Sequence, residues 1–347
     1  MVHLKLVAVL SLNWILINAA EESLHQSSAS VECNFAHLHP QRYAAYHISP
    51  STLSSLSIDG ILDDEGWTEV PWSEPFQDIH DNDFEVFDDA DGSTHNYKEF
   101  EINSRNTTWN LWLNRPYRDD GHENSTRVDP HYGFDMLNDA ERLHYWSVEV
   151  ALPLKALASY SSAKVPPKPF SFWRINFSRV EWPVRVVTDV NTGNQYYTKI
   201  AGLSEENWTW SSQYAVNMHR PEWWGYLQFR PPGELPPKYD DDQQHTEKVP
   251  LDSEWNIRYV SFQLYYAQHA YRDALGMYAS SLKEYFASQE AFGCINLFHL
   301  SSSDESFMAQ IGLRTNQKDA RSFEFVSSIK DDGYIVVMKT DPGTFGI

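Results

Sequence analysis

Three glutamates fall on one predicted face of the stretch His80–Asn103, where they could accept hydrogen bonds from a hydroxylated ligand. Apolar and polar residues alternate on both sides of an acidic turn, which predicts two strands with Phe84 and Phe100 on the core face. The opposite face then carries the carboxylates. These glutamates are Glu85, Glu99 and Glu101. A solvated sheet face is the alternative, because charged residues are usually exposed for solubility alone.

A sugar site combines aromatic rings, which stack on the C–H face of a pyranose, with planar polar groups that bind its hydroxyls. The chain holds 13 tryptophans, and we expect some of them to line such a site. Core packing is the alternative for each of them. The candidate carbohydrate-binding residues are Glu85, Glu101, Asn103, Arg174, Asn176, Trp208 and Trp224.

The acidic turn between the two predicted strands could also hold calcium, because Ca²⁺ prefers oxygen-rich loops. Its carboxylates are Asp88, Asp89 and Asp91, next to Gly92. The spacing differs from that of an EF-hand loop, which also needs a distal glutamate. A plain acidic turn is the alternative, and we expect no other cofactor.

Catalysis is weakly indicated. Glu85 and Glu101 could face each other across strands, and paired carboxylates hydrolyse glycosidic bonds. No nucleophile elbow, zinc motif or phosphate loop is present, so binding is favoured over catalysis. A haem module would need an axial Met and His well apart, whereas Met218 and His219 are adjacent.

The formal net charge of -21 argues against a nucleic acid partner and against anionic membrane surfaces. Residues Met1–Ala20 read as a secretory signal, with Lys5 before an apolar run and small residues at its end. A buried N-terminal strand is the alternative. The signal predicts a secreted protein, and four acceptor sequons agree with that route. Their asparagines are Asn106, Asn124, Asn176 and Asn207.

Cys33 and Cys294 are the only cysteines. In an oxidising compartment they could form a disulfide, and two unpaired thiols are the alternative.

An ordered set of motifs runs through the chain from Tyr43 to Phe229. The motifs are Ile58-Asp59-Gly60 with Trp67, Phe76–Ile79, Asn82–Phe87, Phe100–Asn103, Trp146–Pro153, Trp173–Arg179 and Met218–Phe229. With them, this part of the chain resembles the family-9 carbohydrate-binding modules and their secreted relatives. One departure is a segment of several dozen residues that these relatives carry and that is absent here between Ile79 and His80.

The resemblance implies a mostly β fold, an antiparallel β-sandwich with jelly-roll-like or immunoglobulin-like layers. It implies binding of a polysaccharide or oligosaccharide, with cleavage left to an attached or partner enzyme. The alternatives are a glycoside hydrolase in its own right and a non-binding structural relative truncated in the sandwich. It also implies that Glu85 and Glu101 stand near ligand-facing strand positions and that Trp224 lies near an aromatic position of the site. Family relatives bind structural calcium, although no ligand set of theirs matches this chain.

We expect four parts in sequence: a signal at 1–20, the sandwich at 33–230, a linker at 231–253 and an extension at 254–347. Prolines and aspartates stiffen and solvate the linker. Apolar residues at helical spacing predict a helix in Glu254–Ser288, broken near Gly276, and short strands follow it.

Overall fold

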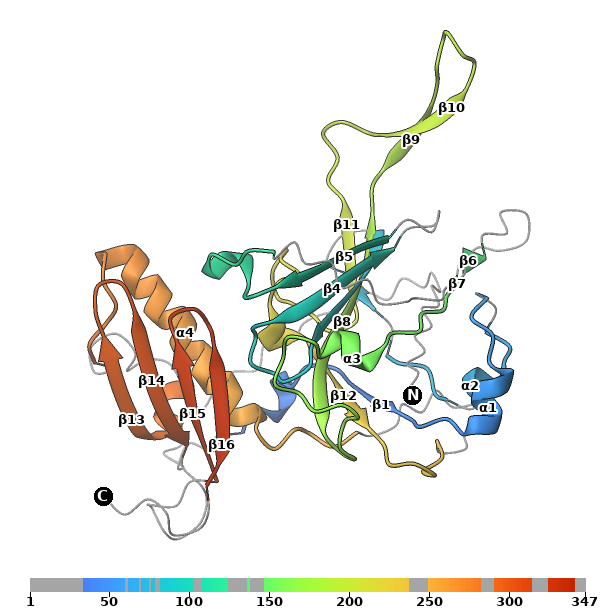
Figure 1. Cartoon of the computed structure of the whole chain (residues 1–347). Helices are drawn as coiled ribbons and strands as arrows, with labels where there is room; N and C mark the ends of the chain where they lie inside the picture. Colours follow the sequence, from blue (N-terminus) through green and yellow to red (C-terminus); the bar gives the residue numbers. More distant parts are fainter. Residues whose placement is uncertain are drawn as a thin grey trace, which may run out of the picture. The chain divides into compact units, whose positions relative to one another are not determined.

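The structure is a computed structural model of the whole chain, shown in Figure 1. It describes residues 34–59, 62–68, 70–74, 76–78, 82–102, 108–123, 136–137, 147–236, 249–281, 290–313 and 324–340. The described residues form two compact units, one of residues 40–250 and one of residues 34–39 with 251–340. The expected signal and most of the expected linker lie outside the described residues.

The first unit is built on one large sheet, in the order β1-β12-β8-β3-β4-β5, with β11 pairing both β8 and β2. All of these pairs are antiparallel except the parallel pair of β1 with β12. The strands of this sheet are β1 (Arg42–Ala45), β2 (Gln77–Asp78), β3 (Asn82–Asp89), β4 (Tyr97–Ile102), β5 (Thr108–Leu113), β8 (Phe172–Glu181), β11 (Glu206–Thr209) and β12 (Gly225–Phe229).

Short elements and two small ladders complete this unit. A two-stranded arm continues the β8–β11 ladder, since Glu181 pairs with Glu206 and Val184 then pairs with Lys199. The arm is β9 (Val184–Thr188) with β10 (Gln195–Lys199), and β6 (Met136–Leu137) pairs with β7 (Ser147–Val148). The helices are α1 (Pro50–Ser55), α2 (Glu65–Thr68), α3 (Leu154–Leu157), η2 (Tyr117–Asp119) and η3 (Pro221–Trp223).

The main core covers one face of the large sheet. Val86, Phe100 and Ile102 lie in it, and the observed register pairs Phe84 with Ile102 and Val86 with Phe100. This confirms the core face that residue alternation predicts. Trp67, the tryptophan of the first motif, is 8% exposed.

A second apolar cluster covers part of the opposite face of the same sheet. It contains Phe87, Tyr97, Leu113 and Trp224, all at most 1% exposed. The face that carries the predicted glutamates is therefore only partly open to solvent, because the segment that leads into β12 packs on it.

The second unit is a helix packed on a four-stranded antiparallel sheet (Figure 1). Helix α4 (Trp255–Leu275) ends at Gly276, whose φ of 76° is the left-handed cap that glycine adopts at low cost. The break predicted near Gly276 is thus the helix end. The sheet is β13 (Ile295–Ser302), β14 (Phe307–Leu313), β15 (Phe325–Lys330) and β16 (Ile335–Lys339). The unit also contains η4 (Glu290–Cys294), directly before β13, and η1 (Ala36–Leu38) from the N-terminal part of the chain.

Polar contacts inside this unit fix the helix on the sheet. The hydroxyl of Ser261 lies 2.7 Å from that of Ser327, and both residues are fully buried. The amide of Gln268 donates to the carbonyl of Ala279 and accepts from its N–H. Such bonds satisfy polar groups that burial would otherwise penalise.

The protein is mostly β, as the sequence predicts. Among the described residues, no helix is both long enough and apolar enough to cross a membrane.

Candidate functional site

Carboxylates and exposed aromatic rings meet on the open part of the second sheet face. Glu101 on β4 pairs in register with Trp109 on β5 and with Glu85 on β3. Directly paired residues share a face of the sheet. Trp109 is 50% exposed, and Tyr117, in the turn after β5, is 47% exposed. We call Glu99, Glu101, Trp109, Tyr117 and Glu123 the acidic–aromatic face.

The three carboxylates of this face lie near enough to the Tyr117 hydroxyl to act on it. The pKa of its hydroxyl is raised, first by partial burial and then by the negative charges of Glu99, Glu123 and Glu101. Glu123 is exposed and bridges to Leu113 at the end of β5. An aromatic ring in reach of several carboxylates can stack on a sugar ring while the carboxylates accept from its hydroxyls.

The turn that carries Tyr117 is held tightly. The N–H of Gly121 donates to the carbonyl of Pro116, and a Cβ on Gly121 would overlap the carbonyl oxygen of Arg115. Only glycine fits there. Arg118, next to Tyr117, donates from both terminal nitrogens to the carboxylate of Glu222 at 2.7 and 3.0 Å.

The ring of His219 packs against the ring of Tyr117. Its ring lies 4.6 Å from the Tyr117 ring in an edge-on contact, and its Nδ1 lies 3.0 Å from the hydroxyl of Tyr97. Its Nε2 is 3.9 Å from a carboxylate oxygen of Glu99. Burial lowers the pKa of His219 to about 4, so the ring is neutral at pH 7.

Three residues predicted to bind sugar are buried and hold the protein together instead. Arg174 donates to the carbonyls of Pro221 and Glu222 and lies 4.2 Å from the centre of the Tyr226 ring. The other two are Asn176 and Trp224, which are at most 1% exposed. None of the three offers a free surface to a ligand.

Asn176 and Trp224 are fixed by named partners. The amide of Asn176 donates to the carbonyl of Ser211 at 3.0 Å and accepts from its N–H at 2.9 Å. The indole N–H of Trp224 donates to the carbonyl of Met218 at 2.9 Å, and its ring packs against Phe87. These contacts close the 211–224 segment over the sheet.

The remaining predicted residues are spread out. Trp208 is half-buried on β11 and pairs with Asp78 and Arg179, away from β4 and β5 in the strand order. Glu85 lies opposite Glu101 in register, and its side chain is outside the described residues, as is Asn103.

Two of the four sequon asparagines lie within the described residues. Asn176 is 1% exposed and Asn207 is 7% exposed. Because a glycan is bulky and needs surface, neither position has room for one in this fold. Asn106 and Asn124 lie outside the described residues.

The carboxylates of the acidic turn do not converge on one point. Asp88 and Asp89 are successive residues of β3 and so point to opposite faces. Asp89 accepts from the N–H of Thr94, and Asp91 accepts from the N–H groups of Ser93 and Ser162. No group of three metal-ligating side chains occurs in the described part of the chain. The three aspartates therefore form no shared cluster among the described residues, and calcium binding at this turn stays a prediction.

Asp88 is the unusual member of this turn. It is 1% exposed, and neither carboxylate oxygen has a hydrogen-bond partner. Burial, with the nearby charges of Asp89 and Asp91, raises the pKa of Asp88 well above its usual value.

Cys294, which is fully buried, is disulfide-bonded. Cys33, the only other cysteine of the chain, lies outside the described residues.

Sequence reasoning missed Trp109 and Tyr117 as site residues. Trp109 follows the alternation of its strand, which could have been matched to Glu101. Tyr117 sits in a turn, where no periodicity applies. A comparison with protein-family models, with curated proteins and with solved structures found no match to this chain. The family resemblance therefore rests on the sequence motifs alone.

Proposed function

We propose that this protein binds carbohydrate through the acidic–aromatic face. The observation that carries the proposal is the pairing of Glu101 with the half-exposed Trp109, next to the half-exposed Tyr117. Sugars present apolar C–H faces on which exposed aromatic rings can stack, and here two such rings lie beside carboxylates. The resemblance to family-9 modules supports the same class of ligand.

Polar groups on this face suit hydroxyls. Glu101 supplies acceptors and the exposed Glu123 supplies another at the rim, whereas Glu99 is only 4% exposed. Charge-assisted hydrogen bonds are the stronger kind, so each carboxylate can orient a pair of sugar hydroxyls. A neutral polysaccharide or oligosaccharide fits better than a uronic acid polymer, whose carboxylates the glutamates would repel.

The proposed function also implies a location and a partner for the protein. We place the protein outside the cell, as a binding partner of an enzyme that cleaves the polysaccharide, with no catalytic role of its own. The large sheet would form one layer of the sandwich that the resemblance implies. The segment absent between Ile79 and His80 would belong to the other layer. We place the ligand on β4 and β5 because Glu101 and Trp109 pair there.

The experiment compares two exposed tryptophans. Trp109→Ala removes the ring from the acidic–aromatic face, and Trp72→Ala removes an equally exposed ring, at 49%, from the segment before β2. Affinity electrophoresis against xylan, cellulose and mannan, followed by calorimetry with the matching oligosaccharide, measures binding. We expect Trp109→Ala to lose about 1–3 kcal/mol of binding free energy and Trp72→Ala to bind normally.

Binding that is equal in both variants would move the site elsewhere. Failure of the folded parent protein to bind any glycan of a broad panel would remove the proposal. Folding of each variant is checked by chemical unfolding, because both side chains are half-exposed and neither should change stability by much.

A further inference from the structure

The turn between β13 and β14 presents a run of serines followed by acids. The turn itself spans residues 303–306, and every residue of it is exposed. The hydroxyl of Ser303 accepts from the N–H groups of Glu305 and Ser306, so this side chain holds the turn closed. Ser301 lies two residues earlier and is also exposed, and its hydroxyl makes no turn-closing hydrogen bond of this kind among the described contacts.

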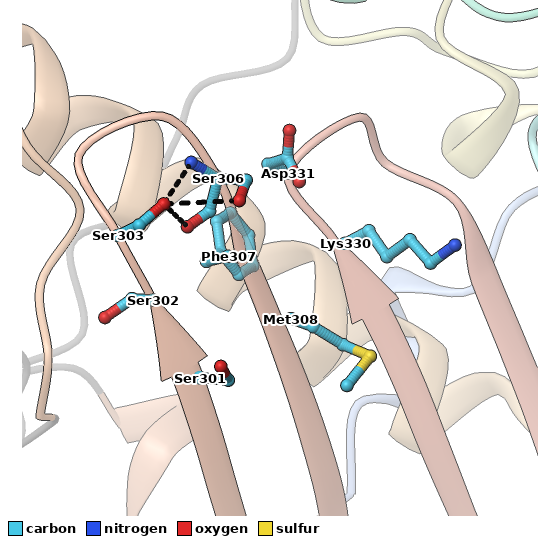
Figure 2. A pocket seen from close by; sticks show the side chains of 8 residues that line it. All are labelled: Ser301, Ser302, Ser303, Ser306, Phe307, Met308, Lys330 and Asp331. Carbon is cyan, nitrogen blue, oxygen red and sulfur yellow. Dashed lines mark hydrogen bonds between the residues drawn. The ribbon is translucent and has the colours of Figure 1, made fainter.

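A hollow of about 280 Å³ lies next to this turn, as Figure 2 shows. Ser301, Met308 and Lys330 lie across it on three neighbouring strands, because Ser301 pairs with Met308 and Met308 pairs with Lys330. They share one face of the sheet. Lys330 is therefore the cation nearest in register to Ser301, and its ammonium group now lies 5.1 Å from the centre of the Tyr334 ring, from which it would have to turn to reach position 301.

Ser301 is also accessible along its backbone. In the sheet order β13-β14-β15-β16, β13 is an edge strand among the described strands. An edge strand is extended and can pair with a strand of another protein. Extended segments are the conformation in which enzymes that modify side chains hold their substrates.

We propose that Ser301 is a phosphorylation site for a protein kinase that selects acidic residues after the serine, and that the reaction takes place before the protein leaves the cell. Asp304 stands three positions after Ser301, and Glu305 follows it. Both acids are exposed, so a basic groove of the kinase can pair with them. The hydroxyl of Ser301, unlike that of Ser303, can react without opening the turn.

The chemistry is a single phosphoryl transfer from a nucleoside triphosphate. The Oγ atom of Ser301 attacks the γ-phosphorus, the new O–P bond forms, and the bond to the bridging oxygen breaks. The nucleoside diphosphate leaves, and the serine proton passes to the catalytic base of the kinase.

The phosphate on Ser301 would have a cationic partner in Lys330. A phosphoserine carries nearly two negative charges at pH 7 and three acceptor oxygens. At position 301 these oxygens face the hollow that Lys330 lines. A charge-assisted bond between them would tie the edge strand β13 to β15 across β14.

The test treats the full chain with ATP, magnesium and an acid-directed protein kinase. Intact mass and peptide mapping count and locate the phosphates. We expect one phosphate on Ser301 and none there in Ser301→Ala. Asp304→Asn should slow the reaction by about tenfold. Asp331→Asn, which removes an acid from the same hollow but not from the motif, should leave the rate unchanged.

Lys330→Gln tests the effect of the phosphate on stability separately from its attachment to Ser301. This variant should accept phosphate at the parent rate but lose the rise in Tm that phosphorylation gives the parent protein. The proposal is overturned by an unmodified parent protein, by phosphate on other serines with Ser301 untouched, or by equal rates for Asp304→Asn and Asp331→Asn.

Discussion

Arg118 and Glu222 form a two-pronged ion pair that joins two turns of the first unit. The guanidinium nitrogens lie 2.7 and 3.0 Å from the two carboxylate oxygens, and the Glu222 side chain is 1% exposed. Arg220 adds a third contact to this carboxylate at 3.4 Å. The pair connects η2, which carries Tyr117, to η3, so a core interaction positions a ring of the proposed site.

Replacing Arg118 with alanine should destabilise the protein and weaken sugar binding. Removal of Arg118 takes two charge-assisted hydrogen bonds from the buried Glu222 carboxylate and leaves it the longer contact with Arg220, which should cost up to about 3 kcal/mol. Denaturant unfolding measures the loss. The double variant Arg118→Ala/Glu222→Gln should recover part of it, because the buried charge is then gone. Two losses that simply add would mean that the pair does not couple the turns.

Stability should fall as the pH drops from about 6.5 to about 4, because of His219. Its pKa is lowered to about 4 in the folded protein, whereas the unfolded chain titrates near the ordinary value of 6.5. Below 6.5 the unfolded state therefore binds a proton that the folded state does not. This linkage removes roughly 3 kcal/mol across the window.

The measurement is the free energy of unfolding at several pH values in parent and His219→Gln. The variant should show a flatter profile between pH 6.5 and 4. Parallel profiles would mean that His219 titrates normally in the folded protein, and the buried contact with Tyr97 would then be in doubt.

Asp88→Asn should stabilise the protein at neutral pH. The pKa of Asp88 is raised in the folded state, so the folded protein holds a proton that the unfolded chain releases above its ordinary pKa. The contribution of Asp88 to stability is thus most favourable at low pH and is lost as the pH rises through the folded pKa. Removing the charge should recover about 1–3 kcal/mol at pH 7.

The same variant tests calcium. If Ca²⁺ bound at Asp88, Asp88→Asn would instead destabilise the protein, and added calcium would raise the Tm of the parent but not of the variant. Thermal unfolding with calcium and with a chelator separates the two outcomes.

The β3–β4 hairpin could be predicted from the sequence because one physical rule governs it. Alternation with a period of two places Val86 and Phe100 on one face and Glu99 and Glu101 on the other. The rule applies to neighbouring strands and needs no knowledge of the rest of the fold. The end of α4 follows a different rule: Gly276, where the sequence predicts a break in a longer helix, is suited to a left-handed cap and ends the helix.

Alternation does not reveal what covers the second face. Asn176 and Trp224 have the residue types of a sugar site, but the segment between β11 and β12 folds over them. That closure depends on contacts between residues far apart in the chain. Alternation also does not predict Tyr117, because this residue lies in a turn. The contacts of Arg118 and the lack of a side chain at Gly121 fix the position of that turn.

Trp224 and Trp109 should respond in opposite ways to alanine substitution. Trp224 is fully buried against Phe87 and Tyr97, and its indole N–H bonds to the carbonyl of Met218. Trp224→Ala should therefore cost about 3–5 kcal/mol of stability, which includes the cavity left behind. Trp109→Ala exposes no core and should cost less than about 1 kcal/mol.

Chemical unfolding of the two variants, each measured with and without a bound oligosaccharide, checks this contrast. Trp224→Ala should lose stability with or without sugar, and any protein that remains folded should still bind. A Trp224→Ala protein of parental stability that no longer binds would show that this ring faces the ligand, and the site would then lie under the 211–224 segment instead of on β4 and β5.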